Sequence, residues 1–414
     1  MVVMSLLLIS SSAAGTSLRL VEVISSPART QTLKDIIGRF EKSHPGTTVQ
    51  ITSLPFGAAF EKFATMISAG DSPDVVEMPD TWVALYARNG ALVSLEPYLA
   101  KWEITPDLNE RVLRLARQVD GKTAYTLPYG IYMYAMYYNR TLLRAAGVAA
   151  PPTTINEFLE ASRKVAALPG KYGYCLRGGR GGFNDWTVFS NAIAGNNQFF
   201  HPDGTSTLTD PDKIQGLTFF IDYYRRGLAP RDSISWGFNE MVAGFYAGVC
   251  AMMNQDSDVL IAIEQYMKAQ DYGVAPLPKG PSGRAYPTIG YAGWSMLSTS
   301  LHKKLAWELI AWLEGPQGNL AWGQRIGILP ALKSAATDPF YAQPKFKAWF
   351  DELADENVFP TALPSHLKEY AYFKDSLVPA SGQRALLGDI GPAELARLWA
   401  TYLSTAQQKF LQQH

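Results

Sequence analysis

The sequence has little of what common enzyme and metal sites require. It contains two cysteines, Cys175 and Cys250, and five histidines, and neither set shows the spacing of a metal site. No GxSxG elbow, HExxH helix, Walker loop or EF-hand loop is present. We therefore expect no metal, no cofactor and no enzymatic activity. The two cysteines could pair in an oxidising compartment, although two buried free thiols fit the sequence at least as well.

An excess of charge and a long apolar run are also missing. The 37 basic side chains balance 37 acidic ones, so bulk charge favours neither nucleic acid nor an anionic membrane as a partner. No window reaches about 18 consecutive apolar residues, so we expect no membrane span. Apolar residues make up 47% of the chain, which allows sizeable cores, and a length of 414 residues indicates two or three domains.

Aromatic residues, by contrast, are plentiful, with 21 Tyr, 19 Phe and 10 Trp. Most of them should lie in cores, because flat rings bury much area at little cost in entropy. A minority is available to line a ligand cleft.

The first residues have the pattern of a secretory signal. Residues 1–12 are Met, Val, Leu, Ile and Ser, and small residues follow up to Gly15. A short apolar run of this kind is typical of a signal peptide, with Ser12 and Ala14 at the −3 and −1 positions of a cut. The basic segment that precedes such a run is missing, and a buried first strand is the alternative. We predict a signal-peptide remnant over residues 1–16 and export to the periplasm, without a cysteine to carry a lipid anchor.

Apolar periodicity alternates between strand and helix from residue 17 onwards. The predicted elements are strands at 18–23, 49–51 and 74–78 and helices at 30–42, 58–69 and 81–89. This alternation predicts an α/β fold with a parallel sheet and helices on both faces. A second set follows Pro128, where Asn139 can cap a helix and Thr154 and Glu157 form a capping box. Because open α/β sheets bind ligands beyond the carboxyl ends of their strands, the loops after the strands are the candidate site.

A glycine-rich loop spans residues 178–182. It lacks the Gly-Lys-Ser/Thr continuation of a phosphate cradle, and a flexible loop that lets backbone approach a ligand is the better interpretation. Residues 183–186 follow with two aromatic side chains, an amide and a carboxylate. That combination suits a sugar, whose C–H face stacks on Trp186 while polar groups bind its hydroxyls. The alternative for Trp186 is an ordinary core position.

A pair of carboxyl groups follows the predicted strand at 249–253. Asp256 and Asp258 lie two residues apart there. A glycosidase needs two carboxyl groups about 5–10 Å apart across the scissile bond, but no motif supports that assignment. A helix N-cap is the alternative role for either aspartate.

The order of several short segments along the chain is informative. They are residues 36–46, 72–76, 127–139, 151–158, 248–254, 273–278, 290–294 and 328–331. Together they resemble the extracellular solute-binding proteins of family 1, the maltose-binding-like sugar-binding proteins of ATP-binding-cassette (ABC) importers. Each segment alone is weak, but the ordered set covers nearly the whole chain.

The resemblance implies a class II-like periplasmic-binding-protein fold, in which two α/β lobes are joined by hinge strands and close on a ligand. It places one lobe at residues 17–128 plus 287–329 and the other at residues 129–286 plus 330–414. It also implies a monomer that binds a small carbohydrate and docks on the transmembrane permease subunits of an ABC importer. Nucleic acid is not an expected partner, and the permease is the only expected link to the membrane.

The cleft positions of the family fall on named residues of this chain. We assign stacking to Tyr129, Trp186 and Trp294, hydroxyl binding to Asp80, Asp256, Asp258 and Arg325, and further donors to Arg177 and Arg180. The remaining candidates are Ser26, Phe56, Phe183, Asn254 and Gly293. Core packing is the alternative for Trp294, and a surface salt bridge is the alternative for Arg325.

Three platforms and several acidic groups favour a di- or trisaccharide, with an α-galactoside such as melibiose or raffinose as one example. A glycerol-phosphate-type ligand is the alternative in the same class, but it calls for converging basic groups, whereas Asp80, Asp256 and Asp258 are acidic. An exported glycan-cleaving enzyme is the alternative in another class.

Overall fold

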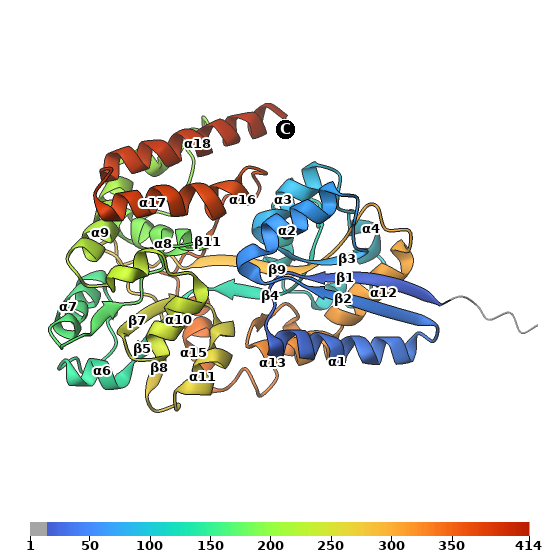
Figure 1. The fold of residues 1–414 in the computed structure, drawn as a ribbon, viewed down its shortest axis with the longest axis horizontal. Helices are drawn as coiled ribbons and strands as arrows, with labels where there is room; N and C mark the ends of the chain where they lie inside the picture. The colour runs from blue at the N-terminus through green and yellow to red at the C-terminus, as the bar shows by residue number, and fades with distance from the viewer. Residues whose placement is uncertain (1–14, 414) are drawn as a thin grey trace, which may run out of the picture.

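A computed structural model of the chain describes residues 15–413, except for the side chain of Phe56. The predicted signal-peptide remnant falls almost entirely outside these residues. Within the described part, no helix combines the length and the apolar character that crossing a membrane requires. Nor do three or more His, Cys, Asp or Glu side chains gather there in a way that could hold a metal ion. The described chain forms two lobes, each built on its own sheet (Figure 1).

The first lobe carries the predicted alternation of strands and helices. Its first strands are β1 (Thr16–Glu22), β2 (Thr47–Ser53) and β3 (Val75–Pro79), and the helices that follow them are α1 (Pro27–Ser43), α2 (Phe56–Ser68) and α3 (Asp80–Arg88). β1 pairs in parallel with β2 and with β3. The spacing of Leu33, Ile36, Ile37 and Phe40 puts these side chains on one buried face of α1, which covers the sheet.

The prediction of a parallel sheet holds for these three strands but not for the sheet as a whole. β9 (Thr288–Met296) lies between β3 and β4 (Leu127–Met133) and is antiparallel to both. β10 (Leu329–Pro330) pairs antiparallel with β4 at the edge, and β11 (Thr361–Ala362) pairs in parallel with β9. The chain leaves or re-enters the lobe at β4, β9 and β10, so these crossings, and not strand–helix units, set their directions.

The second sheet has four strands in the order β6 (Tyr172–Tyr174), β7 (Cys250–Gln255), β5 (Ala135–Asn139) and β8 (Tyr272–Ala275). β7 and β8 run antiparallel to β5, and β6 is parallel to β7. Cys175 and Cys250 form a disulfide, with their Cα atoms 5.4 Å apart, that joins the end of β6 to the start of β7. Of the two interpretations of the cysteines, the paired one is therefore correct.

Capping signals in the sequence correctly place two helices of the second lobe. The Asn139 side chain accepts a hydrogen bond from the Leu142 amide (3.0 Å) at the start of α6 (Arg140–Ala145). Thr154 and Glu157 form the predicted capping box of α7 (Ile155–Ala166). The other α-helices are α4 (Glu96–Leu99), α5 (Glu110–Ala116), α8 (Phe183–Ala194), α9 (Pro211–Arg225), α10 (Phe238–Tyr246), α11 (Leu260–Tyr266), α12 (Lys303–Glu314), α13 (Pro316–Ile326), α14 (Lys333–Ala336), α15 (Lys347–Ala354), α16 (Tyr370–Tyr372), α17 (Val378–Leu387) and α18 (Pro392–Gln413).

Short 3-10 helices and one π-helix are the remaining helical elements of the described chain. The 3-10 helices are η1 (Thr105–Asp107), η2 (Thr207–Thr209), η3 (Arg231–Ile234), η4 (Ser257–Val259) and η5 (Pro344–Phe346). One π-helix, η6 (Phe373–Leu377), connects α16 to α17. The segment α16–η6 reaches the first lobe, because α16 packs against α3.

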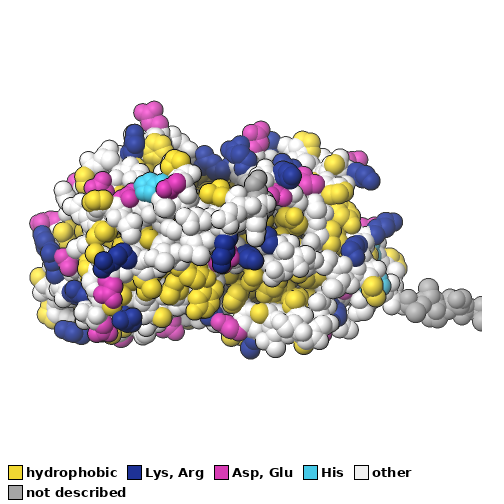
Figure 2. Space-filling view, turned by 90° about the horizontal axis from the view of Figure 1, so that it is seen from above, with side chains coloured by type: hydrophobic (Ala, Val, Ile, Leu, Met, Phe, Trp, Pro, Cys, Tyr) yellow, Lys and Arg dark blue, Asp and Glu magenta, His cyan; other side chains and the backbone are white. Residues whose placement is uncertain are grey.

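Each lobe has its own hydrophobic core, and a third cluster lies at the crossings between them. This third cluster includes Ile131 on β4, Tyr137 on β5 and Trp349 on α15. β4 continues through the predicted lobe boundary at Pro128, although its pairing with β9 shifts register between Pro128 and Gly130, and the boundaries stay a prediction. On the face in Figure 2, basic and acidic side chains are interspersed over both lobes, with no continuous basic patch.

Candidate ligand-binding site

Three carboxyl groups stand where strands of the two lobes end. Asp80 is the first residue of α3, directly after β3, and is 9% exposed. Asp256 and Asp258 follow β7 of the other lobe. Burial raises the pKa of Asp256, and the charges of Asp258 and Asp80 raise it further. These carboxyl groups from opposite lobes therefore lie near one another, and we call the region around them the interlobe site.

Two cations oppose this negative charge. Arg177, which follows β6, lowers the pKa of Asp256 and Asp258 against the effect of their burial. Lys374 does the same for Asp80 and Asp256. Lys374 lies in the π-helix η6, a wide turn of a kind that is frequent at functional sites. Lys374 is not among the predicted site residues, because periodicity predicts a helix but not the wide turn that brings this side chain to the site.

Burial dominates the titration of the site. It raises the pKa of Asp80 to about 6, against the charge of Lys374, and the pKa of Asp258 to about 6, against the charge of Arg29. It raises the pKa of Asp185 in α8 to about 7, against the hydrogen bond from Tyr174 (2.7 Å). Carboxyl groups of this kind are available to a ligand as acceptors, and as donors in their protonated form.

Several buried polar atoms near these groups have no hydrogen-bond partner within the described chain. They are Asp185 Oδ2, Asn254 Oδ1, Asp258 Oδ1 and the Tyr291 hydroxyl. Asn254 and Asp256 are two residues apart on one strand and its continuation, so their side chains leave on the same face. Buried polar groups are nearly always paired in folded proteins, so these atoms have the capacity to bind the hydroxyls of a polar ligand.

We expect the ligand-free protein to gain stability as the pH falls from 8 to 5. Asp80 and Asp185 have folded-state pKa values above the ordinary value of 3.8, so the folded state binds protons more tightly than the unfolded state. Each group adds at most about 1.4 kcal/mol per pH unit. Thermal unfolding at pH 5, 6, 7 and 8 checks this, and Asp185→Asn should flatten the trend. A melting temperature that falls between pH 8 and pH 5 contradicts it.

The comparisons with known proteins agree on one family. The model of the bacterial extracellular solute-binding proteins matches residues 25–320. This chain belongs to that family. The solute-binding protein is 27% identical to a binding protein of Brucella abortus (strain 2308) over 363 residues, which is 87% of each chain.

Two further likenesses extend the comparison. The galactooligosaccharide-binding protein of Bacillus subtilis (strain 168) is 24% identical over 321 residues, 74% of this chain and 71% of that one. The GacH receptor of Streptomyces glaucescens GLA.O superposes with a TM-score of 0.83 at 22% identity, over 97% of this chain and 99% of that one. The superposition with the GacH receptor shows the two-lobed fold that the sequence predicted.

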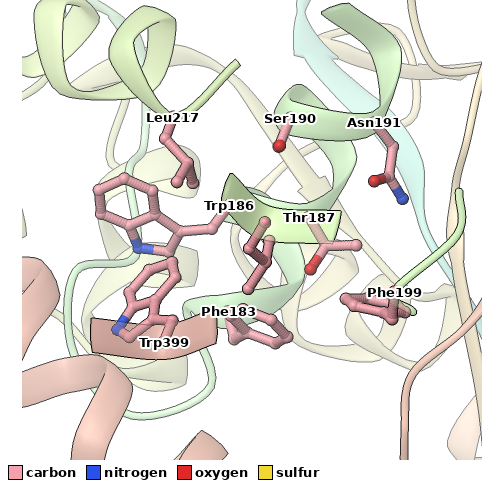
Figure 3. A pocket seen from close by; sticks show the side chains of 9 residues that line it. Phe183, Trp186, Thr187, Ser190, Asn191, Phe199, Leu217 and Trp399 are labelled. Atoms are coloured by element: carbon pink, nitrogen blue, oxygen red, sulfur yellow. The ribbon is translucent and has the colours of Figure 1, made fainter. Parts of the chain in front are cut away.

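One predicted stacking platform of the solute-binding protein lies in the core of the second lobe. Trp186 in α8 is 2% exposed and packs against Phe220. Its other ring neighbour is Trp399 (Figure 3). Phe183 lies in the same core and is 1% exposed. A ring that is covered on both faces cannot stack on a sugar. The structure therefore favours the core alternative for Trp186, and the binding role of Phe183 stays a prediction.

The predicted aromatic residues of the first lobe are also buried, and their binding roles stay predictions. Trp294 is 1% exposed, and its ring centroid lies 5.9 Å from that of Tyr129, which is fully buried. The Tyr129 hydroxyl donates to Glu77 at 2.7 Å, so it belongs to a buried network and not to a stacking surface. A side chain at Gly293 would lie 2.1 Å from the Leu127 carbonyl oxygen, so this glycine permits the close pairing of β4 and β9.

The remaining predicted site residues lie in different environments. Ser26 is exposed and caps α1 by accepting a hydrogen bond from the Arg29 amide (3.3 Å). Arg325 is exposed in the last turn of α13, and no salt bridge to it occurs among residues 15–413. Phe56 begins α2, and its side chain lies outside the described part. Asp256 occupies the N-cap position of η4 but makes no capping hydrogen bond with its side chain.

Asp185 is not among the named site predictions, although its carboxylate belongs to the polar groups of residues 183–186 that were expected to bind sugar hydroxyls. It stands next to Trp186 in the segment that suggested a sugar site. Adjacent residues of a helix point in directions about 100° apart, so α8 can bury the indole in the core and direct the carboxyl group to Tyr174 on β6. Within this segment the acid, and not the indole, lies with the charged groups.

The glycine-rich loop joins the two lobes through Arg180. Its guanidinium contacts the Glu61 carboxylate at 2.5 Å and donates to the Gly57 carbonyl oxygen at 2.5 Å, and both acceptors lie on α2 of the first lobe. The Arg180 side chain is 26% exposed and that of Glu61 is 57% exposed, so the pair is a partly solvated one. Gly178 and Gly179 pack against the backbone of residues 234–236, which holds the loop in place.

We expect the Arg180–Glu61 pair to slow ligand release. An exposed pair contributes about 0.2–1 kcal/mol, which corresponds to at most about a fivefold increase in the dissociation rate when it is removed. Stopped-flow measurements on Arg180→Gln, Glu61→Gln and the double variant isolate the coupling between the two side chains. The pair Glu160–Lys164 lies within α7 alone, and its removal is the control. Equal effects from both pairs would show that Arg180 does not link the lobes.

Proposed function

We propose that this protein captures a carbohydrate in the interlobe site and delivers it to the transmembrane subunits of an ABC importer. The observation that carries the proposal is the convergence of Asp80, Asp256 and Asp258 from opposite lobes, with buried unpaired polar atoms beside them. Carboxylates form short, directional hydrogen bonds with hydroxyl groups, and a ligand held by both lobes favours their closure. The name of the Bacillus subtilis relative supports an oligosaccharide.

The finer proposal is a ligand of two or three sugar units, for which an α-galactoside is one candidate. The protein acts as an exported monomer, closes by rotation of the lobes about the segments that cross between them, and binds without cleaving. Donor and acceptor groups are supplied from two lobes, so a ligand that reaches both makes more hydrogen bonds than one sugar ring can.

A thermal-shift panel tests the proposal. Melibiose, raffinose, maltose, cellobiose and their monosaccharides are compared with glycerol 3-phosphate. A ligand at 100 times its Kd stabilises the folded state by about 2.7 kcal/mol, which raises the melting temperature measurably. We expect the largest shift with a di- or trisaccharide. A shift with glycerol 3-phosphate and with no sugar would contradict the proposal.

Chromatography of the bound ligand distinguishes binding from cleavage. We expect an oligosaccharide to be recovered intact after long incubation with the protein, because no catalytic motif accompanies the paired carboxyl groups. Release of shorter sugars would instead support a glycan-cleaving enzyme.

A further inference from the structure

The charge of the interlobe site is unbalanced. Five carboxyl groups affect one another or share the same cations there: Asp80, Asp185, Asp256, Asp258 and Asp375. Arg177 and Lys374 are the two cations that act on them without a carboxylate partner of their own among the described residues. With every group ionised, the site therefore carries an excess of three negative charges.

The other two cations nearby are already neutralised by their own partners. Arg180 contacts the Glu61 carboxylate at 2.5 Å. Arg29 contacts the Glu77 carboxylate at 2.9 Å, and both of these side chains are buried. Neither pair changes the charge balance of the site. All five carboxyl groups have a raised pKa, with burial as the main cause, so the cations present do not offset the cost of burying them.

Unpaired polar atoms give a second, independent indication of what the site binds. Asn254 and Asp185 are each 1% exposed, and Asn254 Oδ1 and Asp185 Oδ2 find no donor within the described chain. Asp258 Oδ1 is likewise unpaired. All three atoms are acceptors, and the unpaired Tyr291 hydroxyl can supply only one donor, so the site offers few free donors for them and little positive charge. A protonated amine supplies both, because it carries up to three N–H donors and one positive charge.

We propose that the ligand is an amino sugar, or a short glycoside that contains one, with its protonated amine among Asp256, Asp258 and Asp185. This inference rests on the proposed function and names the substrate class of the same site. The hydroxyl groups of the ring bind the remaining acceptors and the cations Arg177 and Lys374. A neutral sugar would satisfy hydrogen bonds but would leave the excess of negative charge unchanged.

The test uses sugars that differ at one substituent. Cellobiose, the glucosamine disaccharide of the same linkage and its fully N-acetylated form carry a hydroxyl, an ammonium and an acetamido group at the same carbon. Galactose, galactosamine and N-acetylgalactosamine form a second set. Affinities are measured by calorimetry at pH 7. We expect the amine member of at least one set to bind at least tenfold more tightly than its hydroxyl counterpart, and acetylation to remove the gain.

Salt and a matched pair of variants identify the origin of the preference. Raising the ionic strength should weaken binding of the amine more than binding of the neutral sugar, because salt screens the attraction between a charged ligand in solvent and the negative site. Asp256→Asn should bring the affinity ratio of amine to hydroxyl sugar towards one. Asp222→Asn removes an exposed carboxyl group from α9, outside the site, and should leave the ratio unchanged.

Each outcome bears on the inference. Equal or tighter binding of the hydroxyl member, or of any neutral sugar in the wider panel, overturns the amino-sugar assignment and leaves carbohydrate capture standing. A preference for the amine that persists in Asp256→Asn overturns the placement of the amine. Binding of putrescine and of no sugar would overturn the proposed function together with this inference.

Discussion

Replacement of Asp256 by alanine is expected to weaken ligand binding between about tenfold and about 100-fold. Hydrogen bonds to a charged group contribute about 1.5–3 kcal/mol, and each 1.4 kcal/mol is a factor of ten in affinity. The same replacement should raise the melting temperature of the ligand-free protein, because burial and the neighbouring Asp258 make this carboxyl group costly. Calorimetric titration and thermal unfolding measure the two effects on one preparation.

The expected loss of affinity, combined with the expected rise in melting temperature, makes this prediction specific to a binding residue. A carboxyl group that only supported the fold would lower both the affinity and the melting temperature when removed. Asp222→Ala is the control, since Asp222 lies on α9 in an exposed pair with Arg226 and should change neither quantity by a measurable amount. Loss of stability in Asp256→Ala, or unchanged affinity, would contradict the assignment.

The fold was largely predictable because its signals are local. Apolar spacing such as that of Leu33, Ile36 and Phe40 places α1, and the side chains of Asn139 and Thr154 place the starts of α6 and α7. The pairing of β9 with β3 and β4 was not predictable in this way. It joins segments more than 150 residues apart in the sequence, and strand direction there depends on how the chain crosses between the lobes.

The candidate site was predictable in part, because α/β sheets bind ligands beyond the carboxyl ends of their strands. Asp80, Asp256 and Asp258 were selected as residues that follow strands, and the structure brings them together. The sequence gives no measure of burial, so it did not show that Trp186 and Trp294 are nearly inaccessible, and their stacking roles stay predictions. Lys374 escaped notice because its position depends on a wide turn that lies far in sequence from Asp80, Asp256 and Asp258.

Replacement of Glu77 by glutamine is expected to lower the free energy of unfolding by about 3–5 kcal/mol. Glu77 is fully buried, and one of its oxygens accepts hydrogen bonds from the Val23 and Ile24 amides. The other accepts from Arg29 Nη2 at 2.9 Å and from the Tyr129 hydroxyl at 2.7 Å. Removing the negative charge leaves the buried guanidinium of Arg29 without compensation, which is the costly way to break a buried ion pair.

Urea titration of three variants tests this account and separates it from a general effect of charge removal. Asp71→Asn breaks the exposed pair with Arg19 and should change the free energy of unfolding by less than about 1 kcal/mol. Adding Arg29→Met to Glu77→Gln should recover part of the loss, because no buried charge then remains unpaired. A loss in Glu77→Gln no larger than that in Asp71→Asn would mean that the network is not a source of stability. Failure of the second change to recover stability would instead assign the loss to the hydrogen bonds with the amides and Tyr129.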